Sequence, residues 1–229
     1  HPEYRRQRQM CIRDRERLPG IKICGITNFS DAEKSILLGA DYLGFILYPS
    51  SPRFIELSLV RELFKQSQDH SYQKVLVDVN PEPEKLKVYS EEGFDFFQLH
   101  FPHDININRI ESWKNVIGAE NLWLAPKIPP QTEFPSKLIN YADHFLIDAY
   151  SSTSFGGTGE QSDWEEFSRC KDRYSEKKWI LAGGLGLENA NRAIYSLHPD
   201  IIDFNSAIEI EPGKKDHGKL SSLFSNLRG

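Results

Sequence analysis

The chain of 229 residues is long enough for one domain with a large core, and no apolar run approaches the ~18 residues that span a membrane. Its three cysteines show no CxxC spacing and belong to no His/Cys cluster, so they indicate neither a disulfide framework nor a zinc site and fit a reducing cytoplasm. The net charge of the chain is −5. The first 20 residues hold six arginines against three acidic residues, so the rest of the chain carries −8. This acidic body argues against nucleic acid as a partner.

Residues 1–20 differ from the rest of the chain in being rich in arginine and lacking apolar periodicity. They contain no hydrophobic stretch, so they are not predicted to be a secretory signal. A transit peptide and a nucleic-acid arm are alternatives, which the interspersed acidic residues and the acidic body respectively weaken. We expect a disordered or non-native extension without predicted function, followed by a single catalytic domain over 21–229.

The first predicted strand, over residues 21–25, places polar side chains on one face. Strand alternation sends Ile21 and Ile23 to the other face, which we expect to pack against helices. Lys22 and Cys24 then face inward, where an unpaired ammonium group costs several kcal/mol and needs a partner. Because a nearby cation lowers the pKa of a thiol, Cys24 is a candidate reactive group.

The remaining chain alternates apolar strand-like runs with segments bounded by glycine, proline and capping residues. Further strands are expected over residues 42–47, 74–79, 94–100, 122–127, 144–148, 179–182 and 201–205. Helices are expected from residue 28 or 30 to about 38, and over 56–68, 81–93, 106–117, 132–141, 163–174, 187–197 and 216–227. Strands and helices that alternate throughout pair in parallel, and eight such units close a barrel. The predicted fold class is therefore α/β, a (β/α)8 TIM barrel.

Polar residues or glycines follow most of these strands, at the end of the barrel where active sites lie. The candidates are Cys24, Arg53, Gln98, His100, Asp148, Gly183, Gly184, Asn205 and Ser206. Arg53 lies in a proline-bounded loop, where it is either a solvated charge or, through its planar fork, a carboxylate ligand. His100 is either a titrating group or, as is more common for a histidine that closes a strand, a structural one.

Asp148 and Cys24 form a candidate pair of acid and base. Asp148 ends an apolar strand, where an N-cap or a salt-bridged aspartate is the alternative, and no helix begins until about residue 163, which weakens the N-cap. A free cysteine is most often a buried small side chain, but Lys22 on the same face and Asp148 on another strand favour proton transfer across the barrel mouth. Asp203, inward on the last strand, is a candidate partner for Lys22, with a purely structural pairing as the alternative.

Glycines and a serine follow the last two strands, where backbone N–H groups at the start of a helix bind anions. Gly183 and Gly184 alone are weak evidence because turns use glycine everywhere, but their position beside Ser206 predicts a barrel of the phosphate-binding type. Gly157 belongs to a glycine-rich loop, FGGTG, which is a lid, a further phosphate contact or simply a loop.

The chain contains, in this order, the segments KICGIT, GADYLGF, YPSSPR, VNPEPE, QLH, LID, GGTGExxDW, LAGGLGLENA and NSAIEIEPGKKD. Their ordered succession from residue 21 to about residue 220 strongly resembles the phosphoribosylanthranilate isomerase family of tryptophan biosynthesis. The resemblance implies an Amadori rearrangement of N-(5'-phosphoribosyl)anthranilate to 1-(2-carboxyphenylamino)-1-deoxyribulose 5-phosphate, without a cofactor or metal. It also implies a small phosphorylated substrate as the partner, no nucleic acid or membrane, and a cytoplasmic monomer or homodimer.

By this resemblance Cys24 falls on the general base, Asp148 on the general acid, and Arg53 on the arginine that holds the anthranilate carboxylate. Asp148 would protonate the furanose ring oxygen, so its pKa should be raised by burial. Cys24 as a thiolate would take the proton from C2', and Lys22 would help raise the thiolate fraction. The glycines and the serine fall on the phosphate site, and the remaining candidates for substrate contact are Lys22, Gln98, His100, Gly157 and Asn205.

Phe101, Ser162 and Ala207 depart from the family's usual pattern. Ala207 stands where glycine would let the backbone approach phosphate closely, so phosphate affinity could be weaker. One alternative is the histidine-pathway isomerase of the same reaction type, which has two repeated halves and an aspartate on strand one where this chain has Cys24. Another is a non-catalytic barrel, which the loss of Cys24 or Asp148 would have supported; both are present.

Overall fold

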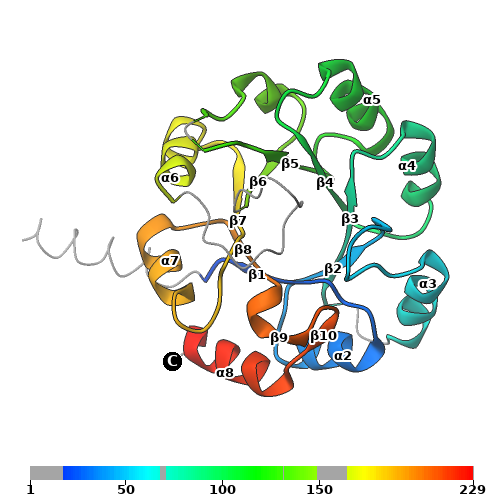
Figure 1. Cartoon of the computed structure of the whole chain (residues 1–229), viewed down its shortest axis with the longest axis vertical. Helices are drawn as coiled ribbons and strands as arrows, with labels where there is room; N and C mark the ends of the chain where they lie inside the picture. The colour runs from blue at the N-terminus through cyan, green and yellow to red at the C-terminus, as the bar shows by residue number, and fades with distance from the viewer. Residues whose placement is uncertain (1–17, 68–70, 131, 149–163, 229) are drawn as a thin grey trace, which may run out of the picture.

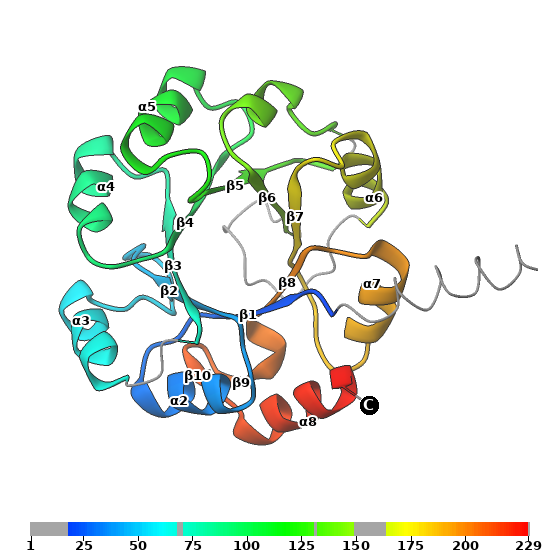
Figure 2. The same cartoon turned by 180° about the vertical axis from the view of Figure 1, so that it is seen from behind.

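Eight parallel strands close into a barrel, and helices form a ring around it (Figures 1 and 2). The computed structural model describes residues 18–67, 71–130, 132–148 and 164–228. Each strand pairs in parallel with the next, and β8 pairs with β1 to complete the ring. The strands are β1 (Gly20–Cys24), β2 (Tyr42–Ile46), β3 (Gln73–Val79), β4 (Phe96–Pro102), β5 (Leu122–Lys127), β6 (His144–Ile147), β7 (Lys178–Leu181) and β8 (Ile201–Phe204). The predicted TIM barrel is confirmed.

The helices alternate with the strands and cover the outside of the barrel. They are α2 (Phe29–Leu37), α3 (Leu57–Gln66), α4 (Pro83–Ser90), α5 (Ile107–Ile117), α6 (Trp164–Arg173), α7 (Ala190–Leu197) and α8 (His217–Arg228). Of the two predicted caps for α2, the side chain of Asn28 accepts the hydrogen bond, from the backbone N–H of Asp31. Among the described residues, no helix combines the length and apolarity that a membrane crossing would require.

One predicted helix is shorter and tighter than expected. A helix was expected over residues 132–141, and the segment contains a short 3-10 helix, η1 (Ser136–Asn140). Pro135 supplies the physical reason, because its ring removes a backbone N–H and disfavours the helical conformation for Phe134 before it. The connection from β5 to β6 therefore covers the barrel with a single tight turn of helix.

A hairpin that the sequence pattern did not indicate lies between β8 and α8. After β8 the chain forms a 3-10 turn, η2 (Ser206–Ile208), and then the antiparallel strands β9 (Glu209–Glu211) and β10 (Lys214–Lys215). Gly213 makes the reversal between these strands with a φ of 82°, a conformation that favours glycine. The hairpin lies beside α2, and it contributes charged side chains to the site described next.

The core has two layers, one between the strands and the helices and one inside the barrel. Ile21 and Ile23 belong to the outer layer, whereas Cys24 belongs to the inner one, as strand alternation predicted. The inner layer comprises Cys24, Ile46, Val75, Val77, Trp123, Ala125, Leu146, Ile180, Ala182 and Ile201. This packing fills the barrel interior, so a ligand can enter only at an end.

Aromatic rings occupy the N-terminal end of the barrel. Trp123 has its ring centroid 5.4 Å from those of both Tyr42 and His144, and 5.1 Å from that of Phe96. Burial lowers the pKa of His144 to about 4, so its imidazole packs there as a neutral ring. These rings therefore fill the barrel interior at the end where the strands begin.

Candidate active site

A cavity of about 430 Å³ lies at the C-terminal ends of the strands. Loops after β2, β6, β7 and β8 contribute to its lining, as do the ends of β1, β3 and β4. The predicted site residues that line it are Cys24, Arg53, Gln98, His100, Asp148, Gly183, Gly184, Asn205 and Ser206. Lys22 lies deeper, fully buried among the strands, and Gly157 lies outside the described residues. Segments far apart in the sequence thus meet at one barrel mouth.

Lys22 and Asp203 form an ion pair beneath this cavity. β1 and β8 pair in a register that places the two residues opposite each other, and Lys22 Nζ lies 2.8 Å from Asp203 Oδ2. Burial alone would lower the pKa of Lys22, but Asp203 and Cys24 outweigh it and hold that pKa above its ordinary value. The predicted partner of Lys22 is therefore confirmed.

The Cys24 thiol sits in the barrel interior, with 4% of its surface exposed. Burial raises its pKa above the ordinary value, and the nearby carboxylate of Asp203 adds to the rise, while Lys22 only partly opposes it. The expected help from Lys22 is present, because its charge and its hydrogen bond both lower the pKa of the thiol and so raise the thiolate fraction. Burial outweighs that effect, so the net pKa still lies above the ordinary value.

Gly44, in the middle of β2, makes room for these groups and was missed from the sequence. A side chain at this position would begin 2.8 Å from Cys24 Sγ and 3.0 Å from Lys22 Nζ. Both atoms therefore pack over the bare backbone of Gly44. A glycine inside an apolar strand marks the close approach of another group, and that signal was present in the segment YLGFIL.

Asp148 follows β6 and lines the cavity on the face that Leu146 shares. It is partly exposed at the mouth, and α6 begins only at Trp164, so it does not cap that helix. Asp148 and Cys24 enter the same cavity from strands on different sides of the barrel. An acid and a base in this arrangement can act on different atoms of one bound substrate.

Gln98 and His100 lie on β4 and contact each other through their side chains, with 2.8 Å between Gln98 Nε2 and His100 Nε2. Burial and then the charge of Lys22 lower the pKa of His100 to about 3, so the interpretation of His100 as a group that titrates near neutral pH is wrong. Its neutral ring instead orients Gln98. The buried Gln98 Oε1 has no hydrogen-bond partner among the described residues and lines the cavity, where it can accept a bond from a ligand.

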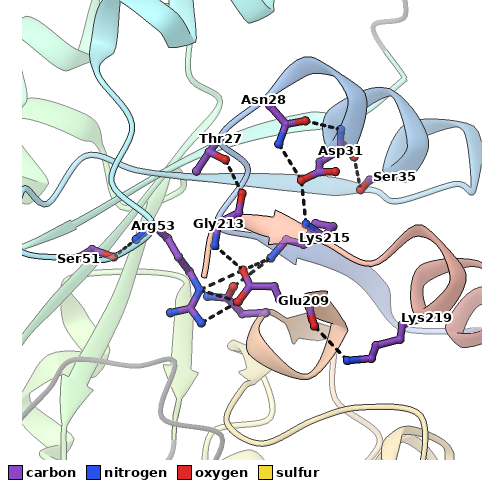
Figure 3. A network of polar contacts seen from close by, with 11 residues as sticks. Thr27, Asn28, Asp31, Ser35, Ser51, Arg53, Glu209, Gly213, Lys215 and Lys219 are labelled. Atoms are coloured by element: carbon purple, nitrogen blue, oxygen red, sulfur yellow. Dashed lines mark hydrogen bonds and ion pairs between the residues drawn. The ribbon is translucent and has the colours of Figure 1, made fainter. Parts of the chain in front are cut away.

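Arg53 is buried, with 8% of its surface exposed, so the solvated-charge alternative is wrong. Its guanidinium meets the carboxylate of Glu209 along one edge: Nε lies 3.0 Å from both carboxylate oxygens, and Nη2 lies 2.7 Å from Oε2 (Figure 3). Among the described residues, Arg53 Nη1 has no hydrogen-bond partner. Because Arg53 also lines the cavity, this nitrogen is available to an anionic ligand.

Glu209 and Lys215 are two buried charged residues that the sequence analysis missed. Both come from the hairpin after β8, and Lys215 Nζ lies 2.8 Å from Glu209 Oε1 and 3.0 Å from Asn205 Oδ1. The sequence offered two glutamates and two lysines in IEIEPGKK, with no pattern that separates the buried from the exposed member of each pair. The fold of the hairpin determines which glutamate and which lysine are buried.

The turns after β7 and β8, where the sequence predicts an anion site, both line the cavity. Gly183 and Gly184 have φ values of 87° and 60°, which side chains rarely adopt, and Ser206 opens the η2 turn beside them. Ala207, one of the departures from the family pattern, is exposed at these turns. It lies close to Gly186, since a side chain on Gly186 would begin 2.9 Å from the Ala207 methyl group. Phe101 packs instead in the outer core, and Ser162 lies outside the described residues.

The described residues contain no group of three or more His, Cys, Asp or Glu side chains arranged to hold a metal ion. The chemistry available at the cavity is that of two proton-transfer groups, an arginine with one free nitrogen, and backbone N–H groups at two turns. These groups suit an anionic, phosphorylated ligand with a second negative charge.

Comparisons with known proteins point in the same direction. The family model described as N-(5'phosphoribosyl)anthranilate (PRA) isomerase matches residues 21–226. N-(5'-phosphoribosyl)anthranilate isomerase from Petrotoga mobilis is 39% identical over 86% of this chain and 90% of the relative. A structure of monomers of the dimeric enzyme of this name from Thermotoga maritima is similar, with a TM-score of 0.74, 31% identity and coverage of 93% of this chain and 100% of that one. A structure in complex with reduced 1-(o-carboxyphenylamino)-1-deoxyribulose 5-phosphate is also similar, with a TM-score of 0.72, 30% identity and the same coverage.

Proposed function

The chain belongs to the N-(5'-phosphoribosyl)anthranilate isomerase family, and we propose that the cavity at its barrel mouth carries out the family's reaction with the residues described above. The protein is an isomerase of tryptophan biosynthesis that converts N-(5'-phosphoribosyl)anthranilate to 1-(2-carboxyphenylamino)-1-deoxyribulose 5-phosphate. The observation that supports the assignment of roles is that Cys24, Asp148 and Arg53 line one cavity together with the glycine and serine turns.

Asp148 is the proposed general acid. Proton donation to the furanose ring oxygen breaks the C1'–O bond, and the nitrogen lone pair forms the Schiff base. The carboxyl group must be protonated at the start, so we expect substrate binding to exclude water from it and raise its pKa. Its place at the mouth, rather than deep in the barrel, allows it to regain a proton from solvent after each turnover.

Cys24 is the proposed general base. Removal of the proton from C2' of the Schiff base gives an enolamine, which tautomerises to the ketose product, so electrons move within one molecule and no external oxidant is needed. Burial makes the thiolate scarce, but a thiolate with a raised pKa is a stronger base once formed. The adjacent Lys22 limits the cost of placing that negative charge in the interior.

The two ends of the substrate carry the charges that fix its orientation. The free nitrogen of Arg53 suits the anthranilate carboxylate, and the N–H groups near Gly183, Gly184 and Ser206 suit the phosphate. Gln98 Oε1 suits a ribose hydroxyl, because it is a buried acceptor without a partner among the described residues.

We propose a monomer or homodimer in a reducing cytoplasm, with no cofactor. The Thermotoga maritima relative is described as dimeric, which supports the second state without deciding it for this chain. A reducing compartment would keep Cys24 as the free thiol that the mechanism needs.

The experiment that tests this function follows the fluorescence of freshly prepared phosphoribosylanthranilate in the presence of the purified protein. We expect rapid decay with the wild type and a loss of about 10²–10⁴-fold in kcat for Cys24→Ala and for Asp148→Ala. Absence of decay with a folded wild type would refute the activity. Retention of activity in both variants would keep the reaction and refute the two roles.

A further inference from the structure

We propose that Glu209 is a positioning residue that fixes how Arg53 presents its guanidinium to the cavity, and thereby sets the selectivity of the site for substrates with a carboxylate on the aromatic ring. The inference rests on the function proposed above and adds a residue and a specificity rule to it. The relationship is drawn in Figure 3, where Glu209 lies between Arg53 and Lys215.

The contact between Arg53 and Glu209 restricts the guanidinium to one orientation. Two guanidinium nitrogens bind one carboxylate, at 3.0 Å from Nε and 2.7 Å from Nη2, which is the planar geometry that holds an arginine most firmly. The bound edge points to the hairpin. The remaining guanidinium nitrogen, Nη1, has no partner among the described residues. Glu209 therefore determines which edge of the Arg53 guanidinium faces a ligand.

Glu209 is itself held rigidly in the fold. Its Oε1 atom accepts hydrogen bonds from Lys215 Nζ at 2.8 Å and from the backbone N–H of Gly213 at 3.2 Å, while its backbone carbonyl accepts one from Lys219 Nζ at 3.0 Å. The backbone N–H of Lys215 in turn donates to Asp31 at the start of α2. A carboxylate anchored to a hairpin and a helix in this way can serve as a fixed reference for Arg53.

The other side of Arg53 is closed by backbone. Gly25 has a φ of 75°, and a side chain there would begin 2.9 Å from Arg53 Cδ and 2.9 Å from Asn205 Oδ1. The aliphatic part of Arg53 therefore lies against Gly25, and its charged end lies against Glu209. Both contacts are made by groups of the protein itself, so the fold holds Arg53 in this position.

The charges of this group favour an anion at the cavity. Arg53 and Lys215 are two cations that share one carboxylate, and all three side chains are at least nine-tenths buried. Burial lowers the pKa of Lys215, and the charge of Glu209 opposes that shift. Glu209 thus favours the charged form of Lys215, and two basic side chains that share one carboxylate favour an anionic ligand at the cavity.

The variant Glu209→Gln tests the hold of Glu209 on Arg53. Glutamine has nearly the same size as glutamate but lacks the carboxylate that binds two guanidinium nitrogens at once, so the hold on Arg53 is weakened. We expect KM for phosphoribosylanthranilate to rise about tenfold while kcat changes by less than about threefold. Glu209→Asp keeps the charge but shortens the reach, and we expect it to raise KM as well.

The decisive comparison uses the decarboxylated substrate N-(5'-phosphoribosyl)aniline, prepared from ribose 5-phosphate and aniline. If Glu209 acts through Arg53 on the carboxylate, Glu209→Gln and Arg53→Met will each reduce kcat/KM for phosphoribosylanthranilate strongly and for the aniline substrate little. The double variant will lose no more than Arg53→Met alone, because the two residues then act as one unit. Glu166→Gln is the matched control, since it also removes a buried glutamate charge paired with an arginine, on α6, outside the cavity lining.

Each result has a distinct meaning. Three results would overturn the inference. Equal losses on both substrates, or additive effects in the double variant, would indicate a general structural role. A fall in KM for Glu209→Gln would indicate simple charge neutralisation. A wild type that converts neither substrate would instead refute the proposed function. The comparison between variants tests Glu209 only when the wild type is active, so the two failures remain distinguishable.

Discussion

Lys22 Nζ and Asp203 Oδ2 lie 2.8 Å apart in the barrel interior, next to the thiol of Cys24, the proposed general base. The first and last strands of the closed barrel bring these residues together in register. The negative charge of Asp203 adds to burial in raising the pKa of Cys24, and Lys22 opposes that rise only in part. This arrangement gives a scarce but strongly basic thiolate, and it can be tested directly.

We predict that Asp203→Asn lowers the pKa of Cys24. Removing the carboxylate removes one cause of the raised pKa and leaves Lys22 with Cys24 as its nearest anion. The measurement is a pH titration of the thiolate's ultraviolet absorbance, with Cys24→Ala subtracted, and the acid limb of kcat/KM should shift in the same direction. Asp200→Asn, which removes an ion-paired aspartate at the opposite end of the barrel, is the control. An unchanged or higher Cys24 pKa in Asp203→Asn would contradict the prediction.

We predict that Gly44→Ala impairs catalysis more than stability. The added methyl group would start 2.8 Å from Cys24 Sγ and 3.1 Å from Cys24 Cα, so the thiol or its strand must shift. Overpacking of this kind costs about 1–3 kcal/mol of unfolding free energy, whereas a displaced base can cost about 10²-fold in kcat. Chemical denaturation and steady-state kinetics measure the two effects. Gly218→Ala, at an exposed position in α8, should leave both nearly unchanged, and a Gly44→Ala enzyme of normal kcat would refute the crowding argument.

The barrel was predictable because its pattern is repeated eight times, so errors of a few residues at element boundaries did not affect the conclusion. The inward placement of Lys22 and Cys24 followed from strand alternation, and a closed barrel requires the first strand to lie beside the last, which made Asp203 a sound partner. The exception was 132–141, where Pro135 should have been given more weight than the polar, helix-like composition.

The parts of the site that the sequence did not reveal depend on distances. Whether Cys24 has a raised or a lowered pKa depends on how burial compares with the charge of Lys22, and a motif contains neither quantity. Glu209 and Glu211 are chemically identical in the sequence, yet one is buried against Arg53 and the other exposed. The geometry of the hairpin determines which glutamate is buried, and the hairpin itself was not predicted.

We predict that His100 makes the protein less stable in acid. Its pKa is about 3 in the folded state against 6.5 for a free histidine, so between these values the unfolded chain binds the extra proton and unfolding becomes easier as the pH falls. From pH 7 to pH 5 this contribution is about 2 kcal/mol. Denaturant titrations of the wild type and His100→Gln at both pH values measure it. The variant should lose less stability over this interval, and parallel pH dependences in the two proteins would show that His100 is not held neutral by the fold.

We predict that the methyl group of Ala207 limits how closely an anion approaches the turns after β7 and β8. Ala207 opposes Gly186, since a side chain on Gly186 would begin 2.9 Å from the Ala207 methyl group. Ala207→Gly should therefore lower the inhibition constant of inorganic phosphate by about two- to fivefold, as expected when a backbone position opens to close approach. Gly186→Ala should raise that constant, because the two methyl groups cannot both occupy their places and one turn must move. In the double variant the crowding is gone, so the effect of Gly186→Ala should largely disappear. Equal effects of Gly186→Ala in the wild type and in the Ala207→Gly variant would show that the two residues do not meet at the phosphate site, and the competitive inhibition assay distinguishes these outcomes directly.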